Sequence, residues 1–189
     1  MVTSKVSGYQ KKAAACRGVV LFEDEVSFWL DGTLHQTWAR VGCQPRVDTY
    51  GQRKTAHLFG AIALHDAHFT YWFADVFDGS TFWSFLKRLV TKYKGRKVFL
   101  IIDNAPWHHL PEEGKEWLVA NRKRIELSRL PPYSPEFNPI EGVWKTTRKM
   151  TTHNRFYETV QQRDSALRQT FTKFQRRPDL IAAHVRRFQ

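Results

Sequence analysis

Three acidic residues, far apart in the chain, are the first candidates for chemistry. Asp24 interrupts an apolar, β-prone run, Asp103 follows a continuous apolar run, and Glu141 lies near the start of a predicted helix. Carboxylate oxygens are the ligands that Mg²⁺ and Mn²⁺ prefer, and these ions keep open positions for phosphate oxygens. The three acids together predict metal-assisted phosphodiester chemistry, in which two ions about 4 Å apart activate the attacking oxygen and stabilise the leaving one.

Each acid also has a purely structural explanation. Asp24 could be a strand-end acid at the solvent boundary, and Asp103 opens an Asp-Asn pair of the kind that ends ordinary strands in turns. The sequence Asn138-Pro139-Ile140-Glu141 has an Asn cap, a Pro at the first helical position and a Glu at the third, which is the capping-box pattern. Glu141 nevertheless borders the apolar stripe of that helix, and from there its carboxylate could point toward the two aspartates.

Other kinds of site find little support in the sequence. There is no His/Cys cluster, no Gly-rich phosphate loop and no Ser-centred elbow, and Cys16 and Cys43 are too few for a disulfide framework or a zinc site on their own. No run of eighteen apolar residues is present, and the basic N-terminus lacks the apolar segment of a secretory signal. We therefore expect a soluble, cytoplasmic protein with no membrane partner.

The distribution of charge indicates the substrate. The 189 residues carry a formal net charge of +12. Residues 1–17 contribute +4 and residues 145–189 contribute +8, whereas residues 18–144 are neutral overall. Positive ends favour nucleic-acid phosphates, because each neutralised phosphate releases condensed counterions. A solvated surface that only aids solubility is the alternative.

The elements that must position the acids read as a mixed α/β domain, and the length suits a single domain. Helices are expected after the Asp78-Gly79-Ser80 cap, over residues 112–122, from Pro139 onward, and in the basic remainder, where Arg177-Pro178 separates the last two. Strands are expected over residues 18–30, 37–41, 58–64, 69–74, 97–102 and 125–127.

Four longer motifs, at residues 22–25, 38–42, 102–108 and 130–144, resemble those of mariner-superfamily transposases. The resemblance covers about residues 18 to 150 and is closest to the bacterial insertion-sequence branch. The last motif is long and specific, and the 37 residues between Asp103 and Glu141 suit the spacing of this DDE class. A ribonuclease H-like α/β fold is implied, with a five-stranded mixed sheet flanked by helices.

The resemblance also implies a reaction and its residues. Asp24, Asp103 and Glu141 match the catalytic acids, which are expected to bind Mg²⁺ or Mn²⁺, as two ions. The implied reaction is metal-dependent DNA strand cleavage at transposon ends, followed by attack of the freed 3′-hydroxyl on target DNA. We expect Glu23, Glu25 and Glu136 to be neighbours of the site rather than ligands. The candidates for DNA binding or for organising the site are Asn104, Trp107, His108, Lys145, Arg148 and Lys149.

Two of these candidates have alternative explanations. His108 could be a turn histidine that caps local backbone. Trp107 could stack on a base, whereas most of the other tryptophans, such as Trp83 and Trp144 on helical apolar stripes, are expected to fill the core.

One departure from the family affects the expected partners. Family members usually carry helix-turn-helix modules before the catalytic domain, but only about seventeen residues precede the first strand here. We expect residues 1–17 to be a basic N-terminal extension, 18–150 the DDE catalytic domain, and 151–189 basic C-terminal helices packed on it. The expected partners are DNA, as transposon ends and target, an upstream-encoded helix-turn-helix protein, and a second copy in a homodimer. The expected location is the bacterial cytoplasm, at the nucleoid.

Two other functions fit the same sequence. The chain could be a non-catalytic or domesticated DNA-binding remnant of the fold, although a protein that only binds DNA has no need of three like-charged acids. It could also be a ribonuclease or a resolvase-type nuclease.

Overall fold

A five-stranded sheet, in the strand order β3-β2-β1-β4-β5, runs through the protein. The computed structural model describes residues 2–49, 51, 54–132 and 134–189, so Tyr133 of the predicted proline-rich loop lies outside the described residues. The strands are β1 (Val19–Trp29), β2 (Thr55–Ala63), β3 (Phe69–Ala74), β4 (Val98–Ile102) and β5 (Ile125–Arg129). The β1–β2 and β2–β3 pairs are antiparallel and the β1–β4 and β4–β5 pairs are parallel, which confirms the expected mixed sheet.

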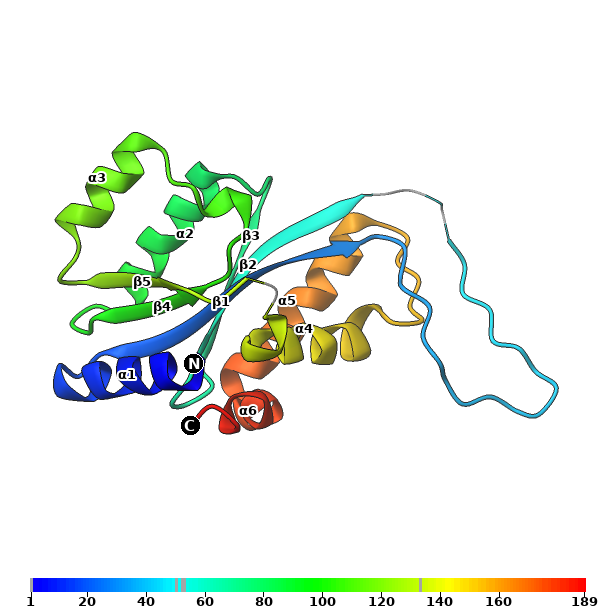
Figure 1. The fold of residues 1–189 in the computed structure, drawn as a ribbon. Helices are drawn as coiled ribbons and strands as arrows, with labels where there is room; N and C mark the ends of the chain where they lie inside the picture. Colours follow the sequence, from blue (N-terminus) through cyan, green and yellow to red (C-terminus); the bar gives the residue numbers. More distant parts are fainter. Residues whose placement is uncertain (1, 50, 52–53, 133) are drawn as a thin grey trace.

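Helices cover both faces of this sheet (Figure 1). On one face lie α2 (Gly79–Lys92) and α3 (Glu112–Ala120). On the other lie α1 (Val2–Ala15), α4 (Ile140–Thr147), α5 (Val160–Arg176) and α6 (Asp179–Arg186). Shorter helical turns are η1 (Pro106–His108), η2 (Pro135–Phe137) and η3 (Arg148–Thr152), the last of which extends α4. No helix among the described residues is long and apolar enough to cross a membrane.

The start of α2 follows directly from the sequence. The Asp78 side chain accepts hydrogen bonds from the backbone N–H groups of Ser80 and Thr81, at 2.9 and 2.8 Å, and the Thr81 hydroxyl accepts one in return from the Asp78 N–H. This reciprocal cap satisfies backbone donors that a helix start leaves unpaired. The predicted apolar stripe of the helix is buried against the sheet, as Phe82, Phe85, Leu86 and Leu89.

The basic C-terminal residues form α5 and α6, which separate at Arg177-Pro178 as expected. Leu167 and Phe171 of α5 and Ile181 of α6 are completely buried and share one apolar cluster with Phe22 of β1 and Trp144 of α4. These helices therefore contribute to the core on the face of the sheet that carries α4.

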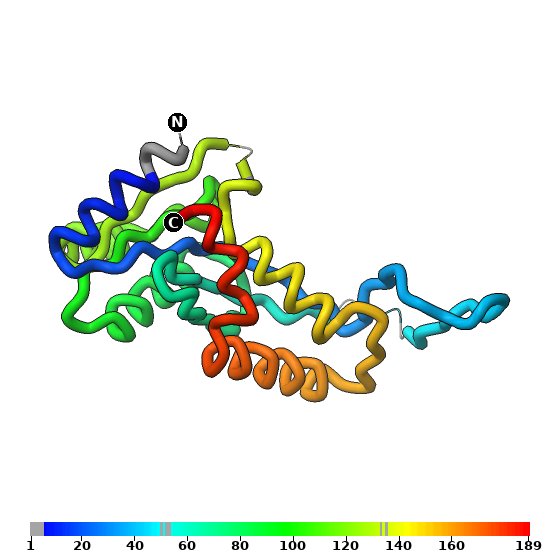
Figure 2. The backbone as a smooth tube through the Cα atoms, turned by 90° about the horizontal axis from the view of Figure 1, so that it is seen from below, coloured from blue at the N-terminus to red at the C-terminus, as the bar shows by residue number. Residues whose placement is uncertain are grey.

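The expected strand over residues 37–41 is wrong. After β1 the chain leaves the sheet as an extended arm, residues 33–49, which projects far from the body of the protein (Figures 1 and 2). Trp38 and Val41 are fully exposed. Their β-prone residue types had suggested a strand, but β1 pairs with β2 and β4, and no described strand lies beside the arm. At its base the arm is held by Asn154, whose amide hydrogen-bonds both the N–H and the C=O of His35, at 2.8 Å each.

Candidate active site

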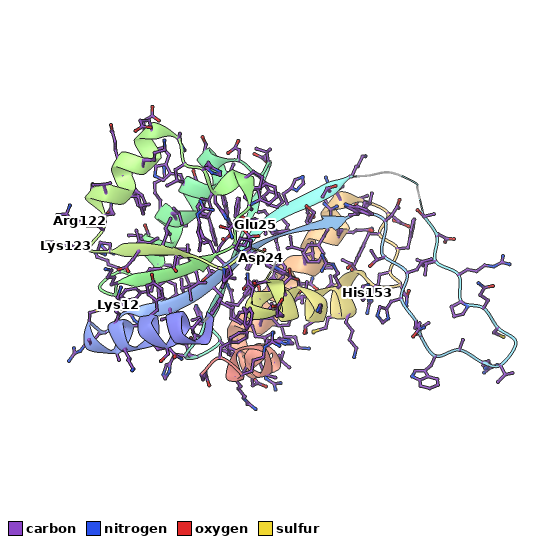
Figure 3. The ribbon with its side chains drawn as sticks, in the orientation of Figure 1. Lys12, Asp24, Glu25, Arg122, Lys123 and His153 are labelled. Carbon is purple, nitrogen blue, oxygen red and sulfur yellow. The ribbon has the colours of Figure 1, made fainter. Side chains whose placement is uncertain are left out.

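The fold brings Asp24, Asp103 and Glu141 to one cavity of about 440 Å³. Asp24 lies in the middle of β1 (Figure 3), and Asp103 is the first residue after β4, the parallel neighbour of β1. Phe22 pairs with Ile101 in this ladder, so the two aspartates occupy corresponding positions two residues further along. Glu141 is the second residue of α4. The remaining lining residues are Asn104, Ala105, Leu130, Pro131, Pro132, Ser134 and Asn138.

Trp144 seats α4 on the sheet and also orients Asp24. Gly60 of β2 lies opposite Asp24, and a Cβ at Gly60 would collide with the Trp144 ring, so this glycine makes room for the indole. The Trp144 side chain is 1% exposed, and its Nε1–H donates to Asp24 Oδ2 at 3.0 Å. One buried aromatic residue therefore fixes both the helix that carries Glu141 and the rotamer of Asp24.

The start of α4 differs from the predicted capping box. Pro139 precedes α4 in a helical conformation, and Asn138 Oδ1 accepts from the Ile140 N–H at 3.4 Å, but no reciprocal hydrogen bond from Glu141 completes a capping box. The Asn138 amide nitrogen also donates to the backbone carbonyl of Glu23 at 2.9 Å. This long-range contact ties the loop before α4 to β1, and Glu141 lines the cavity with the two aspartates instead of closing a reciprocal cap.

The acids disturb one another electrostatically. Burial raises the pKa of Asp24 well above its ordinary value, and the nearby carboxylates of Glu141, Glu25 and Asp103 raise it further against the hydrogen bond from Trp144. The pKa of Asp103 is lowered, because its carboxylate accepts hydrogen bonds from His108 and from the Ala105 N–H. The metal-free cavity thus disfavours the full set of negative charges, a cost that a bound cation would offset.

The raised pKa of Asp24 gives a prediction for stability. The native state holds the Asp24 proton more tightly than the unfolded chain, so the free energy of unfolding falls as pH rises from about 3.9, the unfolded value, through the raised native pKa. Above that pKa the destabilisation is complete. Asp24→Asn keeps an oxygen for Trp144 and removes the charge. We therefore expect this variant to raise the melting temperature of the metal-free protein at about pH 8. The rise should be about 2–4 °C for each kcal/mol added to the free energy of unfolding.

Thermal melts in EDTA between about pH 5 and about pH 8 test this prediction. Asp48→Asn, on the exposed arm, is the matched control and should leave the melting curve unchanged. A lower melting temperature for Asp24→Asn without metal would mean that the ionised carboxylate has a structural role.

A buried ionic cluster lies on the opposite face of β1. His108 Nε2 is 2.8 Å from Glu25 Oε1 and 3.3 Å from Glu23 Oε2, and all three side chains are almost completely buried. The other ring nitrogen, Nδ1, is 3.2 Å from Asp103 Oδ1. Burial alone would lower the pKa of His108, but the hydrogen bonds to Asp103, Glu23 and Glu25 outweigh it and raise this pKa to about 12. An imidazolium therefore links the strand of Asp24 to the loop of Asp103.

The sequence suggested only that Glu23 and Glu25 are neighbours of the site. Strand alternation did place both on the face away from Asp24, which was the available signal. Their partner His108 could not be identified, because the contact depends on the path of the chain after β4. Burial raises the pKa of Glu23 well above its ordinary value, and neither Glu23 oxygen has a well-aligned hydrogen bond among the described residues. The possible ligand atoms of Glu23, Glu25 and His108 lie within 4.8 Å of one another, close enough to hold a cation. The 2.8 Å between His108 Nε2 and Glu25 Oε1, however, is the length of a hydrogen bond, so these two groups pair directly.

The other predicted site residues are spread around the acids. Asn104 lines the cavity and donates to the Leu130 carbonyl at 2.8 Å. Trp107 packs on the Phe77 ring at a centroid distance of 5.5 Å, with its Nε1 buried, outside the residues that line the acid cavity. On α4 and its extension, Lys145 and Lys149 are exposed, and the Arg148 guanidinium lies over the Phe28 ring.

Comparison with known proteins identifies the family of this fold and site. The DDE superfamily endonuclease family matches residues 19–163. The chain is 32% identical over 136 residues to the "Insertion element IS630 uncharacterized 39 kDa protein" of Shigella sonnei, a match that covers 71% of this chain and 39% of that protein. Together these matches confirm the resemblance to the insertion-sequence branch of mariner-type transposases. The chain thus spans about two-fifths of the length of this curated relative.

Solved structures agree at the level of the fold. The "Mos1 mariner paired end complex with Mn" superposes with a TM-score of 0.67 at 14% identity, covering 97% of this chain and 55% of that one. The catalytic core domain of BIV integrase superposes with a TM-score of 0.53 at 11% identity and covers 84% of each chain. The ribonuclease H-like fold is confirmed.

Proposed function

Because the chain belongs to the DDE superfamily endonucleases, we propose that it is the catalytic domain of a DNA transposase that cleaves DNA at transposon ends and joins the freed 3′-hydroxyl to target DNA. The observation that carries the proposal is the convergence of Asp24, Asp103 and Glu141 on one cavity from two strands and a helix. The insertion-element relative supports this choice of substrate. In this proposal residues 18–150 form the catalytic domain, with residues 1–17 as a basic extension and 151–189 as basic helices packed on it.

The acid cavity fits Mg²⁺ or Mn²⁺, and we propose two ions. Asp24 Oδ2 is held by Trp144, and Asp103 Oδ1 is held by Ala105 and His108. Within the described residues no hydrogen bond reaches the second oxygen of either aspartate, so each has one oriented oxygen and one free for a cation. Bound ions would activate the attacking oxygen and stabilise the leaving one. The Mn named with a solved neighbour of the same fold supports a divalent metal.

Two roles around the metal site belong to the same proposal. His108 is a positioning residue, because its imidazolium contacts Asp103 on one side and the glutamates of β1 on the other. Asn104 and the basic residues Lys145, Arg148 and Lys149 border the DNA path. The buried indole nitrogen of Trp107 supports a place in the core for this ring, as an alternative to stacking on DNA.

Cleavage of a substrate panel tests the function. The purified chain is incubated with a transposon-end duplex, an RNA–DNA hybrid and a four-way junction, each in Mg²⁺ and in Mn²⁺. We expect metal-dependent nicking of the duplex. Salt-dependent DNA binding without cleavage in either metal would favour the non-catalytic remnant, and preferential cleavage of the hybrid or the junction would favour a ribonuclease or a resolvase.

A homodimer on paired DNA ends is the assembly that we propose. The arm presents Trp38 and Val41 fully exposed, which is costly unless another surface covers them, and the neighbour of the same fold is a paired end complex. The upstream-encoded helix-turn-helix protein stays a prediction from the sequence. A bacterial cytoplasmic location at the nucleoid is supported by the proposed DNA substrate.

Changing the arm should weaken this dimer. Replacing both Trp38 and Val41 by Ser is expected to raise the dimer dissociation constant at least about tenfold in sedimentation experiments with DNA, because two apolar anchors of about 1–2 kcal/mol each are lost. Val119→Ser changes an exposed apolar residue of α3 and is the control. An unchanged dimer dissociation constant in the arm variant would exclude the arm as the interface.

A further inference from the structure

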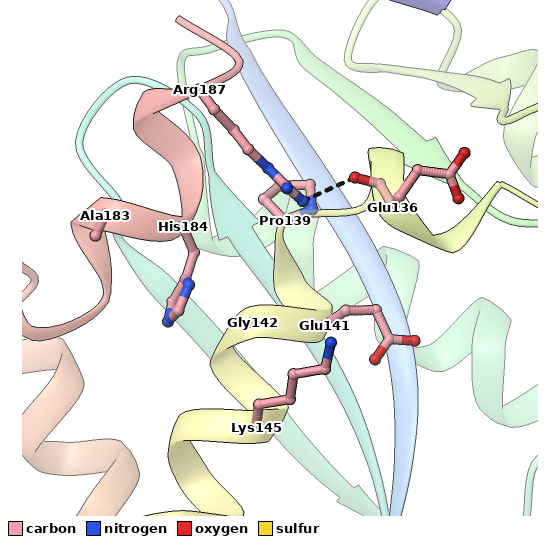
Figure 4. Close-up of a pocket in the computed structure, with 8 residues that line it drawn as sticks. All are labelled: Glu136, Pro139, Glu141, Gly142, Lys145, Ala183, His184 and Arg187. Atoms are coloured by element: carbon pink, nitrogen blue, oxygen red, sulfur yellow. Dashed lines mark hydrogen bonds between the residues drawn. The ribbon is translucent and has the colours of Figure 1, made fainter.

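A second cavity, of about 680 Å³, lies between α4 and α6 (Figure 4). Its lining includes Lys145 of α4, His184 of α6 and Arg187 directly after α6. Glu141 lines both this cavity and the one that holds the aspartates, so the two cavities adjoin at that residue. We call the second one the α4–α6 pocket. Lys145 is already among the predicted DNA-binding residues, whereas Arg187 lies far from every motif.

Close packing of the two helices builds one wall of the α4–α6 pocket. A Cβ at Gly142 would collide with the His184 imidazole, so this glycine lets the ring lie directly on α4. His184 Nε2 lies 2.9 Å from the Thr146 hydroxyl, and Ile181 and Val185 on the same helix are fully buried. The pocket is therefore a formed feature of the core contact between α4 and α6.

Two basic side chains, Lys145 of α4 and Arg187 after α6, line the α4–α6 pocket together with Glu136 and Glu141. Neither Lys145 nor Arg187 forms an ion pair with any residue that the structure describes. Arg187 Nη2 donates to the Glu136 backbone carbonyl at 2.7 Å, which fixes the guanidinium, and in Figure 4 the Glu136 carboxylate points away from it. Burial, Arg187 and Lys145 all lower the pKa of His184, so its imidazole is neutral and the two long side chains supply the charge.

We propose that the α4–α6 pocket binds a backbone phosphate of the DNA strand that is cleaved at the three acids, with Lys145 and Arg187 as its ligands. The inference rests on the proposed function and specifies where the substrate strand runs. A strand that leaves the acid cavity past Glu141 enters this pocket directly. Bound metal ions would neutralise the phosphate at the acids, and Lys145 and Arg187 would neutralise another phosphate of the same strand. An anchored guanidinium suits this task, because its remaining N–H groups keep a fixed direction.

The salt dependence of DNA binding tests the proposal. Each lost phosphate contact should make the slope of log affinity against log salt shallower by about 0.7–0.9. We expect the double variant Lys145→Met with Arg187→Met, which loses the one phosphate contact, to show this whole change, and each single variant to show part of it, with DNA binding measured in Ca²⁺. Arg186→Met removes the same charge from the neighbouring position outside the pocket and should leave the slope unchanged. Arg187→Lys keeps the positive charge and should retain most of the wild-type slope. This variant separates loss of the charge from any effect on folding that comes from losing the hydrogen bond to the Glu136 carbonyl.

Neutral linkages in the DNA locate the contact. Methylphosphonates are placed one at a time along the cleaved strand, and at one position near the scissile bond the wild type should lose affinity while the double variant loses none. Equal losses for both proteins at every position, or equal salt slopes for pocket and control variants, would overturn the inference.

Cleavage by the same wild-type preparation separates the two proposals. Cleavage by the wild type without the expected slope changes in the variants would support the proposed function and exclude only the phosphate-binding role of the α4–α6 pocket. The expected slope changes in the variants, with no cleavage by the wild type, would support DNA binding by the pocket and exclude the proposed cleavage activity.

Discussion

Loss of any one acid should abolish metal-dependent nicking. Asp24→Asn, Asp103→Asn and Glu141→Gln are each expected to lower the rate more than about 1,000-fold, which corresponds to about 4 kcal/mol of transition-state stabilisation. The three carboxylates line one cavity, and the two aspartates offer one free oxygen each among the described residues. Each substitution removes a negative charge that a hard cation requires and leaves side-chain volume almost unchanged.

Single-turnover nicking of a radiolabelled duplex measures these rates, with DNA binding in Ca²⁺ followed in parallel. Asp75→Asn and Glu116→Gln, at exposed positions outside the cavity, are matched controls and should keep wild-type rates. All three acid variants should still bind DNA, because the loss concerns chemistry rather than the basic surfaces. An acid variant that nicks at more than about a tenth of the wild-type rate would exclude that residue as an essential metal ligand.

Local patterns in the sequence were enough for much of the fold. β3 occupies the predicted residues 69–74, and α2 begins directly after the predicted cap at Asp78. Both features depend on residues that are close in the sequence. The strand forms on a run of apolar, β-prone residues, and the helix starts where a side chain accepts hydrogen bonds from the next backbone N–H groups. Asp24 and Asp103 share the cavity for a similar reason, because parallel strands bring corresponding residues together.

Features that depend on distant contacts could not be read in this way. Residues 37–41 have strand-forming types, but a strand also needs a partner, and β1 is already paired on both sides. The Asn138 oxygen accepts from the Ile140 N–H at the start of α4, but the hydrogen bond that its amide nitrogen donates to the backbone of Glu23, 115 residues away, has no local signal. The α4–α6 pocket depends on the packing of His184 of α6 against Gly142, a distant contact that the motif around Gly142 does not reveal.

His108 presents the same problem and leads to the second large effect. Its imidazolium contacts Asp103 at 3.2 Å and Glu25 at 2.8 Å, so it fixes the loop of one metal ligand against the strand of the other. His108→Ala should lower nicking about 10–100-fold, the usual cost of losing a group that orients a metal ligand. Most of this loss should come from weaker Mg²⁺ binding, which is measured as a higher Mg²⁺ concentration at the half-maximal rate. His109→Ala, at the exposed neighbouring position, should behave as wild type.

Stability and positioning have to be separated for this residue. His108→Ala leaves Glu23 and Glu25 buried without their cation, and an unpaired buried charge costs about 3–5 kcal/mol. A triple variant, His108→Leu with Glu23→Gln and Glu25→Gln, removes the whole ionic cluster and should recover much of the melting temperature. If His108 positions Asp103, the triple variant stays defective in Mg²⁺ titrations although it is folded. Recovery of the wild-type Mg²⁺ requirement together with stability would instead show that the cluster only supports the fold.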